Sequence, residues 1–286
     1  MSDLTASRVA RLVARYPLAR AATALGEVSY RSAGAGAALV LLHGIGSQSG
    51  SWAQQLAALA DRHRVVAWDA PGYGESAPLA PAAPTAADYA ARLGDFLDAL
   101  GIARAVLVAS SLGALMAGAF AARWPERVAG LVLLNPAGGY GLAEPAVREA
   151  KLAARLERLA TLGPAGMARN LPAGMLAPKA SDTARALAAW GQSSIQPHGY
   201  AQAARMLANG RLAEDAARYA GPVLVVAADA DTITPLAECQ RIARAFPRAR
   251  FRMVEGAGHL SYLDSPEVVN DAVTEFAARC AEEARA

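Results

Sequence analysis

VLVASSLGAL, residues 106–115, is a short apolar run that passes directly into a pattern of small and apolar residues typical of a helix. It predicts a strand, a sharp turn and a helix, which is the arrangement of a nucleophile elbow that holds a serine hydroxyl above a sheet. Such a strained turn accepts only small residues two positions before and after the serine. Ala109 and Gly113 flank Ser111 in this way, whereas a valine and a leucine flank Ser110. We therefore predict Ser111 as the nucleophile.

A serine hydroxyl needs a base to remove its proton, and in this type of elbow the chain order is serine, acid, histidine. Of the four histidines, only His198 and His259 follow Ser111. A predicted strand and a flexible Gly-Ala-Gly sequence precede His259, whereas no strand precedes His198. We predict His259 as the base and His198 as a polar loop residue.

The acid is expected directly after a buried strand. The Val-rich run at 222–228 is such a strand, and both Asp229 and Asp231 follow it. Either carboxylate could orient the histidine, and periodicity does not choose between them. Asn135 follows the preceding predicted strand, at a second position where such folds keep an acid, but an amide cannot carry the charge.

An oxyanion hole needs two backbone N–H groups aimed at the carbonyl oxygen as it becomes negative. Leu112 follows the predicted nucleophile at the start of a helix, where the helix dipole adds positive potential. Ile45 lies in the loop HGIG, residues 43–46, directly after a predicted strand. We predict these two N–H groups as the donors, and a structural hydrogen bond for His43 at the base of the loop.

Several motifs in the expected order give the chain a resemblance to the α/β-hydrolase family, from about residue 27 to the last predicted helix. They are HGIG at 43–46, DAPGYGES at 69–76, PERV at 125–128 and ADADTITP at 228–235. These segments resemble the family's His-Gly oxyanion loop, its D-x-x-G-x-G-x-S turn, its P-x-R-V link and its G-x-x-D-x-x-x-P segment, the last with alanine in place of glycine. The resemblance implies Asp231 as the acid and a reaction that needs no cofactor.

Within that family, the segments GIGS at 44–47 and GHLS at 258–261 resemble the branch of 3-oxoadipate enol-lactonases and small esterases. This resemblance implies cleavage of a small carboxylic ester or enol-lactone through an acyl-enzyme. Carbon–carbon hydrolases of meta-cleavage products share the plan, but they typically have Trp after the histidine and Asn before the nucleophile, where this chain has Leu260 and Ser110. Such a hydrolase, or a non-catalytic receptor for a small ligand, is the alternative. A serine nucleophile argues against dehalogenases and epoxide hydrolases.

Composition limits the classes of partner. The net charge is only +3, and basic residues are interspersed with acidic ones, so no nucleic-acid partner is expected. No apolar run approaches the roughly 18 residues that a membrane span needs. Cys239 and Cys280 are predicted to be free thiols in a reducing, cytoplasmic setting, and no His/Cys/Asp cluster suggests a metal. We expect a small-molecule substrate, and a homodimer is compatible with the sequence.

Alternating patterns predict an α/β fold with a mostly parallel sheet covered on both faces. The expected strands are 27–32, 38–43, 64–69, 104–109, 129–135, 222–228 and 249–255, and the expected helices lie near 52–61, 85–100, 112–124, 236–246 and 266–284. Residues 1–20 are predicted as a further helix that packs on the body.

The alternation stops between residues 137 and 220, which are helical in pattern with breaks at Gly163-Pro164, Leu171-Pro172, Ala177-Pro178 and 196–199. We therefore predict a core of residues 1–136 and 221–286 and an inserted helical cap of 137–220. The cap is expected over the carboxyl edge of the sheet, where ligands bind. Its bulky candidates for lining a pocket are Met167, Met175, Leu176, Trp190, Tyr200 and Met206. Five cap arginines could pair with a substrate carboxylate, namely Arg148, Arg155, Arg169, Arg185 and Arg205, and the sequence singles out none of them.

Overall fold

A single eight-stranded sheet forms the centre of the molecule in the computed structural model, which describes residues 3–285. The strand order is β1-β2-β4-β3-β5-β6-β7-β8; β2 is antiparallel to both of its neighbours, and all other pairs are parallel. The strands are β1 Ala19–Ala21, β2 Val28–Ala33, β3 Ala38–Leu42, β4 Arg64–Trp68, β5 Ala105–Ser110, β6 Val128–Leu134, β7 Val223–Ala228 and β8 Ala249–Val254. The predicted mostly parallel sheet is confirmed.

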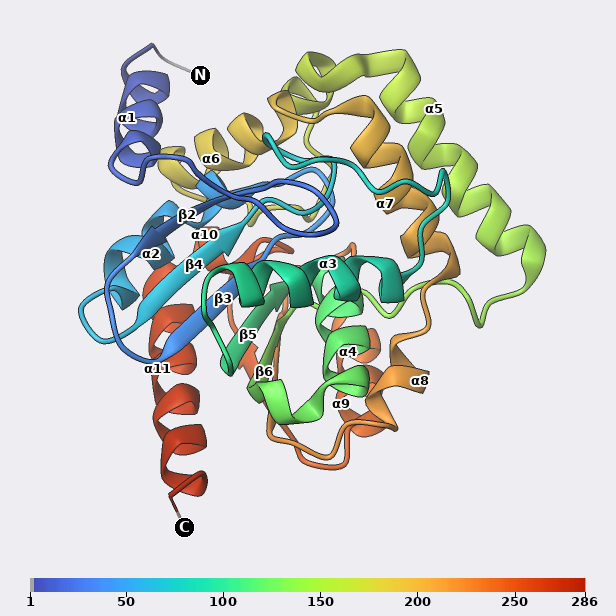
Figure 1. The fold of residues 1–286 in the computed structure, drawn as a ribbon. Helices are drawn as coiled ribbons and strands as arrows, with labels where there is room; N and C mark the ends of the chain where they lie inside the picture. The colour runs from blue at the N-terminus through green and yellow to red at the C-terminus, as the bar shows by residue number, and fades with distance from the viewer. Residues whose placement is uncertain (1–2, 286) are drawn as a thin grey trace.

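Helices cover both faces of the sheet (Figure 1). The inner strands β5, β6 and β7 are rich in Val and Leu and almost entirely buried, as expected for parallel strands packed on both sides. One face packs against α3 (Ala86–Ala99), α4 (Gly113–Arg123), α8 (Leu212–Ala216) and α9 (Leu236–Ala245). The other face packs against α1 (Asp3–Ala14), α2 (Ala53–Leu59), α10 (Ser261–Asp264) and α11 (Pro266–Glu283). Two short 3-10 helices, η1 Ser49–Trp52 and η2 Pro125–Arg127, complete the core.

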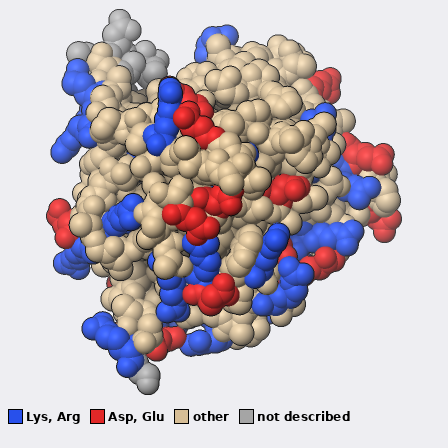
Figure 2. Space-filling model, viewed as in Figure 1, with Lys and Arg blue, Asp and Glu red and all other residues tan. Residues whose placement is uncertain are grey.

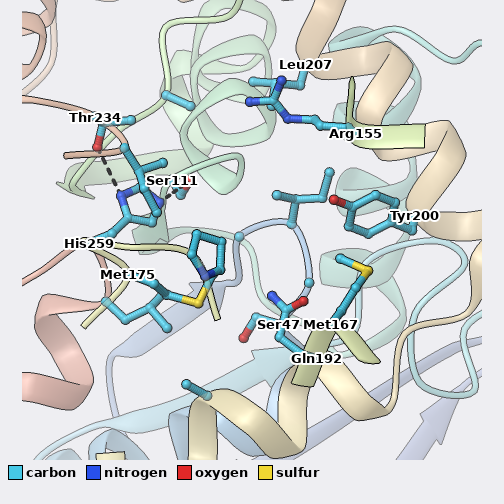
Figure 3. Close-up of a pocket in the computed structure, with 18 of the residues that line it drawn as sticks. Ser47, Ser111, Arg155, Met167, Met175, Gln192, Tyr200, Leu207, Thr234 and His259 are labelled. Atoms are coloured by element: carbon cyan, nitrogen blue, oxygen red, sulfur yellow. Dashed lines mark hydrogen bonds between the residues drawn. The ribbon is translucent and has the colours of Figure 1, made fainter. Parts of the chain in front are cut away.

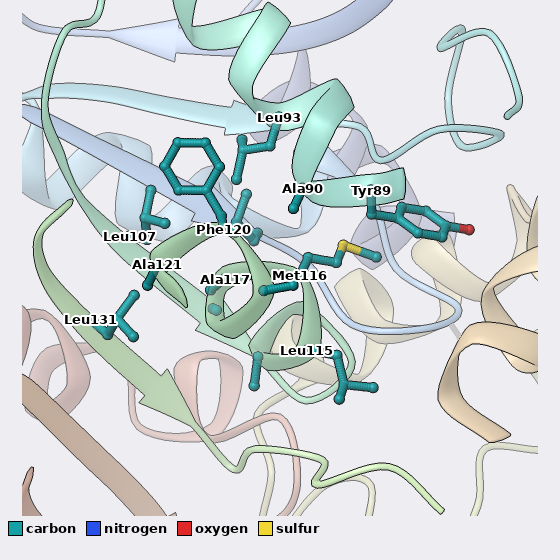
Figure 4. Close-up of a cluster of buried hydrophobic side chains, with 14 of the residues drawn as sticks. Tyr89, Ala90, Leu93, Leu107, Leu115, Met116, Ala117, Phe120, Ala121 and Leu131 are labelled. Carbon is teal, nitrogen blue, oxygen red and sulfur yellow. The ribbon is translucent and has the colours of Figure 1, made fainter. Parts of the chain in front are cut away.

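The helix after the predicted nucleophile is held by a dense apolar cluster. Met116 and Phe120 on α4 are fully buried, and they pack with Tyr89 and Leu93 from α3 in the same cluster (Figure 4). Close-packed interiors of this kind tolerate little movement. The start of α4, and with it the turn at Ser111, therefore has a rigid support.

The segment between β6 and β7 is helical, and it contains α5 (Pro145–Arg169), α6 (Asp182–Ser193), α7 (Pro197–Asn209) and α8. The backbone of α5 is kinked at Gly163, whose φ is +58°, directly before Pro164. The α5–α7 helices lie together on one side of the sheet (Figure 1). We call residues 137–220 the helical insertion.

The amino-terminal prediction needs a correction. The predicted helix over residues 1–20 ends at Ala14, and Ala19–Ala21 instead form β1, which pairs with β2. Pro17 explains the difference, because a proline disfavours the helical conformation of the residue before it. Val9 and Val13 are buried, and α1 packs against α6; residues 1 and 2 lie outside the described part. No helix within residues 3–285 combines the length and apolar character needed to cross a lipid bilayer.

Candidate active site

Ser111 stands at the turn between β5 and α4 in a left-handed conformation, with φ of +51°. Its N–H donates to Leu134 O at 3.0 Å, and its carbonyl accepts from Ala114 N at 3.0 Å. A Cβ at Gly113 would lie 2.5 Å from Leu42 O, closer than a Cβ atom approaches a non-bonded oxygen. The steric requirement for a small residue at this position, inferred from the sequence, is thus confirmed.

His259 connects Ser111 to Asp231. Its Nδ1 lies 2.8 Å from Asp231 Oδ2, and its Nε2 lies 2.8 Å from Ser111 Oγ (Figure 3). Since a carboxylate only accepts hydrogen bonds, Nδ1 carries the proton and Nε2 is left to accept from the hydroxyl. In the sequence, Asp231 lies 28 residues and Ser111 lies 148 residues before His259. The structure therefore brings together three side chains from distant parts of the chain.

The loop that carries His259 is tied to the helical insertion. The N–H groups of His259 and Leu260 donate to Gly174 O at 2.8 Å and Met175 O at 2.9 Å. Asp264 Oδ2 accepts from the N–H of Gly258 on this loop and from that of Ala177 in the insertion, both at 2.8 Å. These bonds hold the imidazole at the boundary between the sheet and the insertion.

The carboxylate of Asp231 is buried and fully engaged. Besides His259, it accepts hydrogen bonds from Ile233 N at 2.7 Å, Thr234 N at 2.9 Å and Thr234 Oγ1 at 2.7 Å. Burial by itself would raise the pKa of Asp231, but the bonds from His259 and Thr234 outweigh it, so this pKa lies below its usual value. Asp229 is exposed, and its carboxylate accepts a hydrogen bond from Gly256 N and not from the imidazole of His259.

Asn135, which was considered from the sequence only as a position for the acid and set aside, lies in the site in a different role. It is the other described non-glycine residue with a positive φ, +48°, and its Nδ2 donates to Asp231 Oδ2 at 2.9 Å. Its Oδ1 accepts from Ser261 Oγ at 2.6 Å. The amide thus bridges the carboxylate to α10; its position after a strand was the only sequence signal.

The two predicted oxyanion donors are unengaged. Neither Ile45 N–H nor Leu112 N–H donates to a protein acceptor within the described residues. The loops that carry these two groups lie against each other: a Cβ added to Gly44 would be only 3.0 Å from Ser111 Cβ. His43 supports this loop as predicted: its Nδ1–H donates to Gly44 O at 2.9 Å and its Nε2 accepts from Ala70 N at 3.0 Å. Burial lowers the pKa of His43, which favours this neutral form.

A cavity of about 550 Å³ opens beside Ser111 and His259, between the sheet and the insertion (Figure 3). Three of the bulky cap residues named from the sequence line it, namely Met167, Met175 and Tyr200, whereas Leu176, Trp190 and Met206 do not. Polar or charged side chains that the sequence did not single out also line it, including Ser47, Lys151, Arg158, Gln192 and Glu238. Of the five cap arginines considered, Arg155 alone reaches it. The cavity is large enough for a small organic substrate.

Charge elsewhere on the molecule is mixed. Acidic and basic side chains are interspersed over the face shown in Figure 2, with no continuous basic stripe on that face. Within the described part of the chain, no group of three or more His, Cys, Asp or Glu side chains is arranged to hold a metal ion.

Residues 37–266 match the model of the alpha/beta hydrolase fold family, and the chain therefore belongs to that family. The predicted fold and enzyme class are confirmed. The chain is 27% identical to 3-oxoadipate enol-lactonase 2 of Acinetobacter baylyi, over 82% of this chain and 86% of that protein. A thermophilic esterase from Thermogutta terrifontis, solved with malate bound, superposes with a TM-score of 0.82 at 27% identity, over 92% and 99% of the two chains. The enol-lactonase from Burkholderia xenovorans LB400 superposes with a TM-score of 0.79 at 26% identity, over 90% and 99%. The predicted resemblance to the enol-lactonase and esterase branch is thus confirmed.

Proposed function

We propose that this protein is a serine hydrolase that cleaves a small carboxylic ester or enol-lactone. The observation that carries the proposal is the chain of two 2.8 Å hydrogen bonds from Asp231 through His259 to Ser111 at the wall of a cavity of about 550 Å³. A nucleophile bonded to a base that is oriented by a third group defines this kind of chemistry. The enol-lactonase and esterase relatives support the choice of substrate class.

In the proposed first step, Ser111 Oγ attacks the substrate carbonyl carbon while His259 Nε2 takes the hydroxyl proton. Asp231 holds the imidazole in the required tautomer and stabilises it when charged. The N–H groups of Ile45 and Leu112 donate hydrogen bonds to the carbonyl oxygen and stabilise the negative charge that develops on it. The protonated His259 then gives its proton to the leaving oxygen, and the acyl group stays on Ser111.

In the second step, His259 removes a proton from a water molecule, which attacks the acyl-enzyme. The same two N–H groups stabilise the second tetrahedral intermediate. Its collapse returns the proton to Ser111 and releases a carboxylic acid. For a lactone both products are parts of one molecule. No metal or organic cofactor takes part in this scheme.

The helical insertion, residues 137–220, is proposed to act as the cap over this reaction. Met167, Tyr200 and Leu207 from α5 and α7 line the cavity opposite Ser111. Excluding water around the reacting atoms strengthens the electrostatic interactions that stabilise the transition state. The insertion would therefore set both substrate size and access.

A screen with aryl esters, enol-lactones and coloured meta-cleavage products tests the proposal. Ser111→Ala is expected to lose about 10⁶-fold in kcat. Ser110→Ala is the matched control, because Ser110 is the adjacent buried serine, and its hydroxyl has no partner among the described side chains; activity is expected to stay within about twofold.

Three outcomes separate the candidates. Ester or lactone turnover that disappears in Ser111→Ala supports the proposal. Turnover restricted to meta-cleavage products would instead identify a carbon–carbon hydrolase with the same three residues. Failure of an organophosphorus reagent to label the protein, together with no turnover, would identify a binding protein on a hydrolase fold.

A further inference from the structure

Three cationic residues on α5 line the same cavity as Ser111. Lys151, Arg155 and Arg158 lie four and three residues apart, so they share one face of the helix. Figure 3 shows Arg155 at the border of the cavity that also reaches Ser111. Burial raises the pKa of Tyr200 on the facing wall, and the positive charges of Arg155 and Arg158 oppose that rise. One wall of the cavity is therefore electropositive.

No acidic side chain in the described part of the chain pairs with the cations of this wall. Among the described side chains, no carboxylate lies within 4.0 Å of these three cations, whereas Arg211, Arg218 and Arg241 each pair with an acid three residues away. Glu238 also lines the cavity, but Arg241 engages both of its oxygens, at 2.6 and 2.9 Å. Among the described lining residues, three cations thus stand against one carboxylate, and that carboxylate is engaged by Arg241.

Arg155 is the cation that is held in place toward the cavity. One terminal nitrogen donates to Lys151 O at 2.9 Å, the other to Tyr140 Oη at 3.3 Å, and the guanidinium lies over the Tyr140 ring at 5.3 Å from its centre. A guanidinium has five N–H donors, so these bonds leave others free. Arg158 instead donates to Asn170 O, and Lys151 is solvent-exposed.

We propose that the substrate carries an anionic group, a carboxylate in the simplest case, and that Arg155 binds it. This inference rests on the proposed hydrolase function, because it assigns the substrate class of the same site. A planar guanidinium forms short charge-assisted hydrogen bonds to a carboxylate, and its orientation by Tyr140 reduces the entropy lost on binding. A neutral substrate would leave this half-buried cation facing apolar atoms.

The test compares esters that differ in charge but scarcely in shape. On the acyl side, 4-nitrophenyl hemisuccinate is paired with 4-nitrophenyl pentanoate; on the alcohol side, the butyrate of 4-hydroxybenzoate is paired with the butyrate of 4-methylphenol. The wild-type enzyme is expected to favour the anion in one pair by about 10- to 100-fold in kcat/KM. That preference should decrease as salt screens the charges. The pair in which the anionic ester is preferred identifies whether the acyl half or the alcohol half of the substrate carries the anionic group.

Variants distinguish binding of the anion from a structural role. Arg155→Met should remove the preference, because kcat/KM falls much further for the anionic ester than for the neutral one, and Arg155→Lys should restore part of it. Arg169→Met is the matched control, since Arg169 is exposed at the end of the same helix and does not line the cavity. An equal loss for both esters in Arg155→Met, or no anion preference in the wild type, would overturn the inference.

A binding measurement separates this inference from the proposed function. Calorimetric titration with glutarate and with glutaramide requires no turnover, and the wild type is expected to bind glutarate about tenfold more tightly, a difference lost in Arg155→Met. If no ester is hydrolysed while this difference persists, the hydrolase proposal fails and the anion site stands. If neutral esters are hydrolysed and glutarate binds no better than glutaramide, only the anion site fails.

Discussion

Asn135 Nδ2 donates a hydrogen bond to Asp231 Oδ2 at 2.9 Å, and this amide, 96 residues earlier in the chain, joins the carboxylate to the end of β6. The same oxygen of Asp231 accepts from His259. Asn135 therefore fixes the oxygen that in turn fixes the imidazole. It is a positioning residue, because it reaches the proposed reacting atoms only through Asp231 and His259.

Replacing Asn135 by alanine removes one donor to a buried carboxylate and leaves the Ser261 hydroxyl without its acceptor. We expect Asn135→Ala to lower kcat by about tenfold with little change in KM, and to lower the free energy of unfolding by about 1–3 kcal/mol. Steady-state kinetics on a neutral aryl ester and denaturant unfolding measure the two effects. A rise in KM with unchanged kcat would contradict the positioning role.

Asp231→Asn should leave the shape of the site intact but allow the wrong tautomer of His259. Loss of about 10⁴-fold in kcat is expected, the scale known for this change in a serine protease triad. Asp229→Asn is the matched control two residues away: its side chain is exposed and bonds only to a loop N–H, so activity should be within about twofold of wild type. Similar losses in both variants would refute the assignment of the acid.

The lowered pKa of Asp231 predicts a pH-dependent contribution to stability. Because the folded state binds this proton more weakly than the unfolded chain, the charged carboxylate stabilises the fold above its usual pKa of 3.8. The contribution disappears as the pH falls through 3.8 toward the lower folded value. Unfolding free energies of wild type and Asp231→Asn, measured between about pH 3 and pH 7, should converge at the acidic end. A constant difference over that range would show that the carboxylate is not stabilised by its partners.

Gly113→Ala tests the steric basis of the elbow. The added Cβ would lie 2.5 Å from Leu42 O, a backbone atom that cannot rotate away, so we expect destabilisation of about 1–3 kcal/mol or failure to fold. Gly94→Ala is the control. That glycine lies inside α3, where a Cβ would meet only ordinary contacts at 3.7 Å or more, and the change should stabilise by about 0.5–1 kcal/mol. Thermal unfolding of both variants measures these changes. A Gly113→Ala variant as stable as Gly94→Ala would contradict the steric basis of the elbow.

Both thiols should resist alkylation in the native state. Burial raises the pKa of Cys239 to about 12 and that of Cys280 to about 11, so thiolate is scarce near neutral pH. Mass spectrometry after iodoacetamide at about pH 8 should detect no modified cysteine before unfolding and two after it. Labelling of the native protein would show that a helix carrying one of them opens readily.

The sequence alone was sufficient to predict those features that depend on residues close together in the chain. Each of the seven expected strands is present within one residue of its predicted ends. For the inner strands the reason is that a strand buried on both faces needs a continuous apolar run, whereas β2 and β8 are only partly buried and contain polar residues. The three-residue β1 and the single-turn α10 were not predicted, since neither is long enough to show the spacing of apolar residues that marks a strand or a helix. The cytoplasmic location and the homodimer stay predictions.

The choice of Ser111 over Ser110 also followed from the chain alone, because the elbow constrains residues only two positions away. The tertiary structure decided what depends on distant segments. It places Asp231, which the family resemblance already favours over Asp229, 2.8 Å from His259 Nδ1. It also joins Asn135 to both Asp231 and Ser261, and it directs Arg155, of the five cap arginines considered, into the cavity. Local patterns carry no such information, since the direction in which a loop or helix side chain points is set by packing between elements far apart in the sequence.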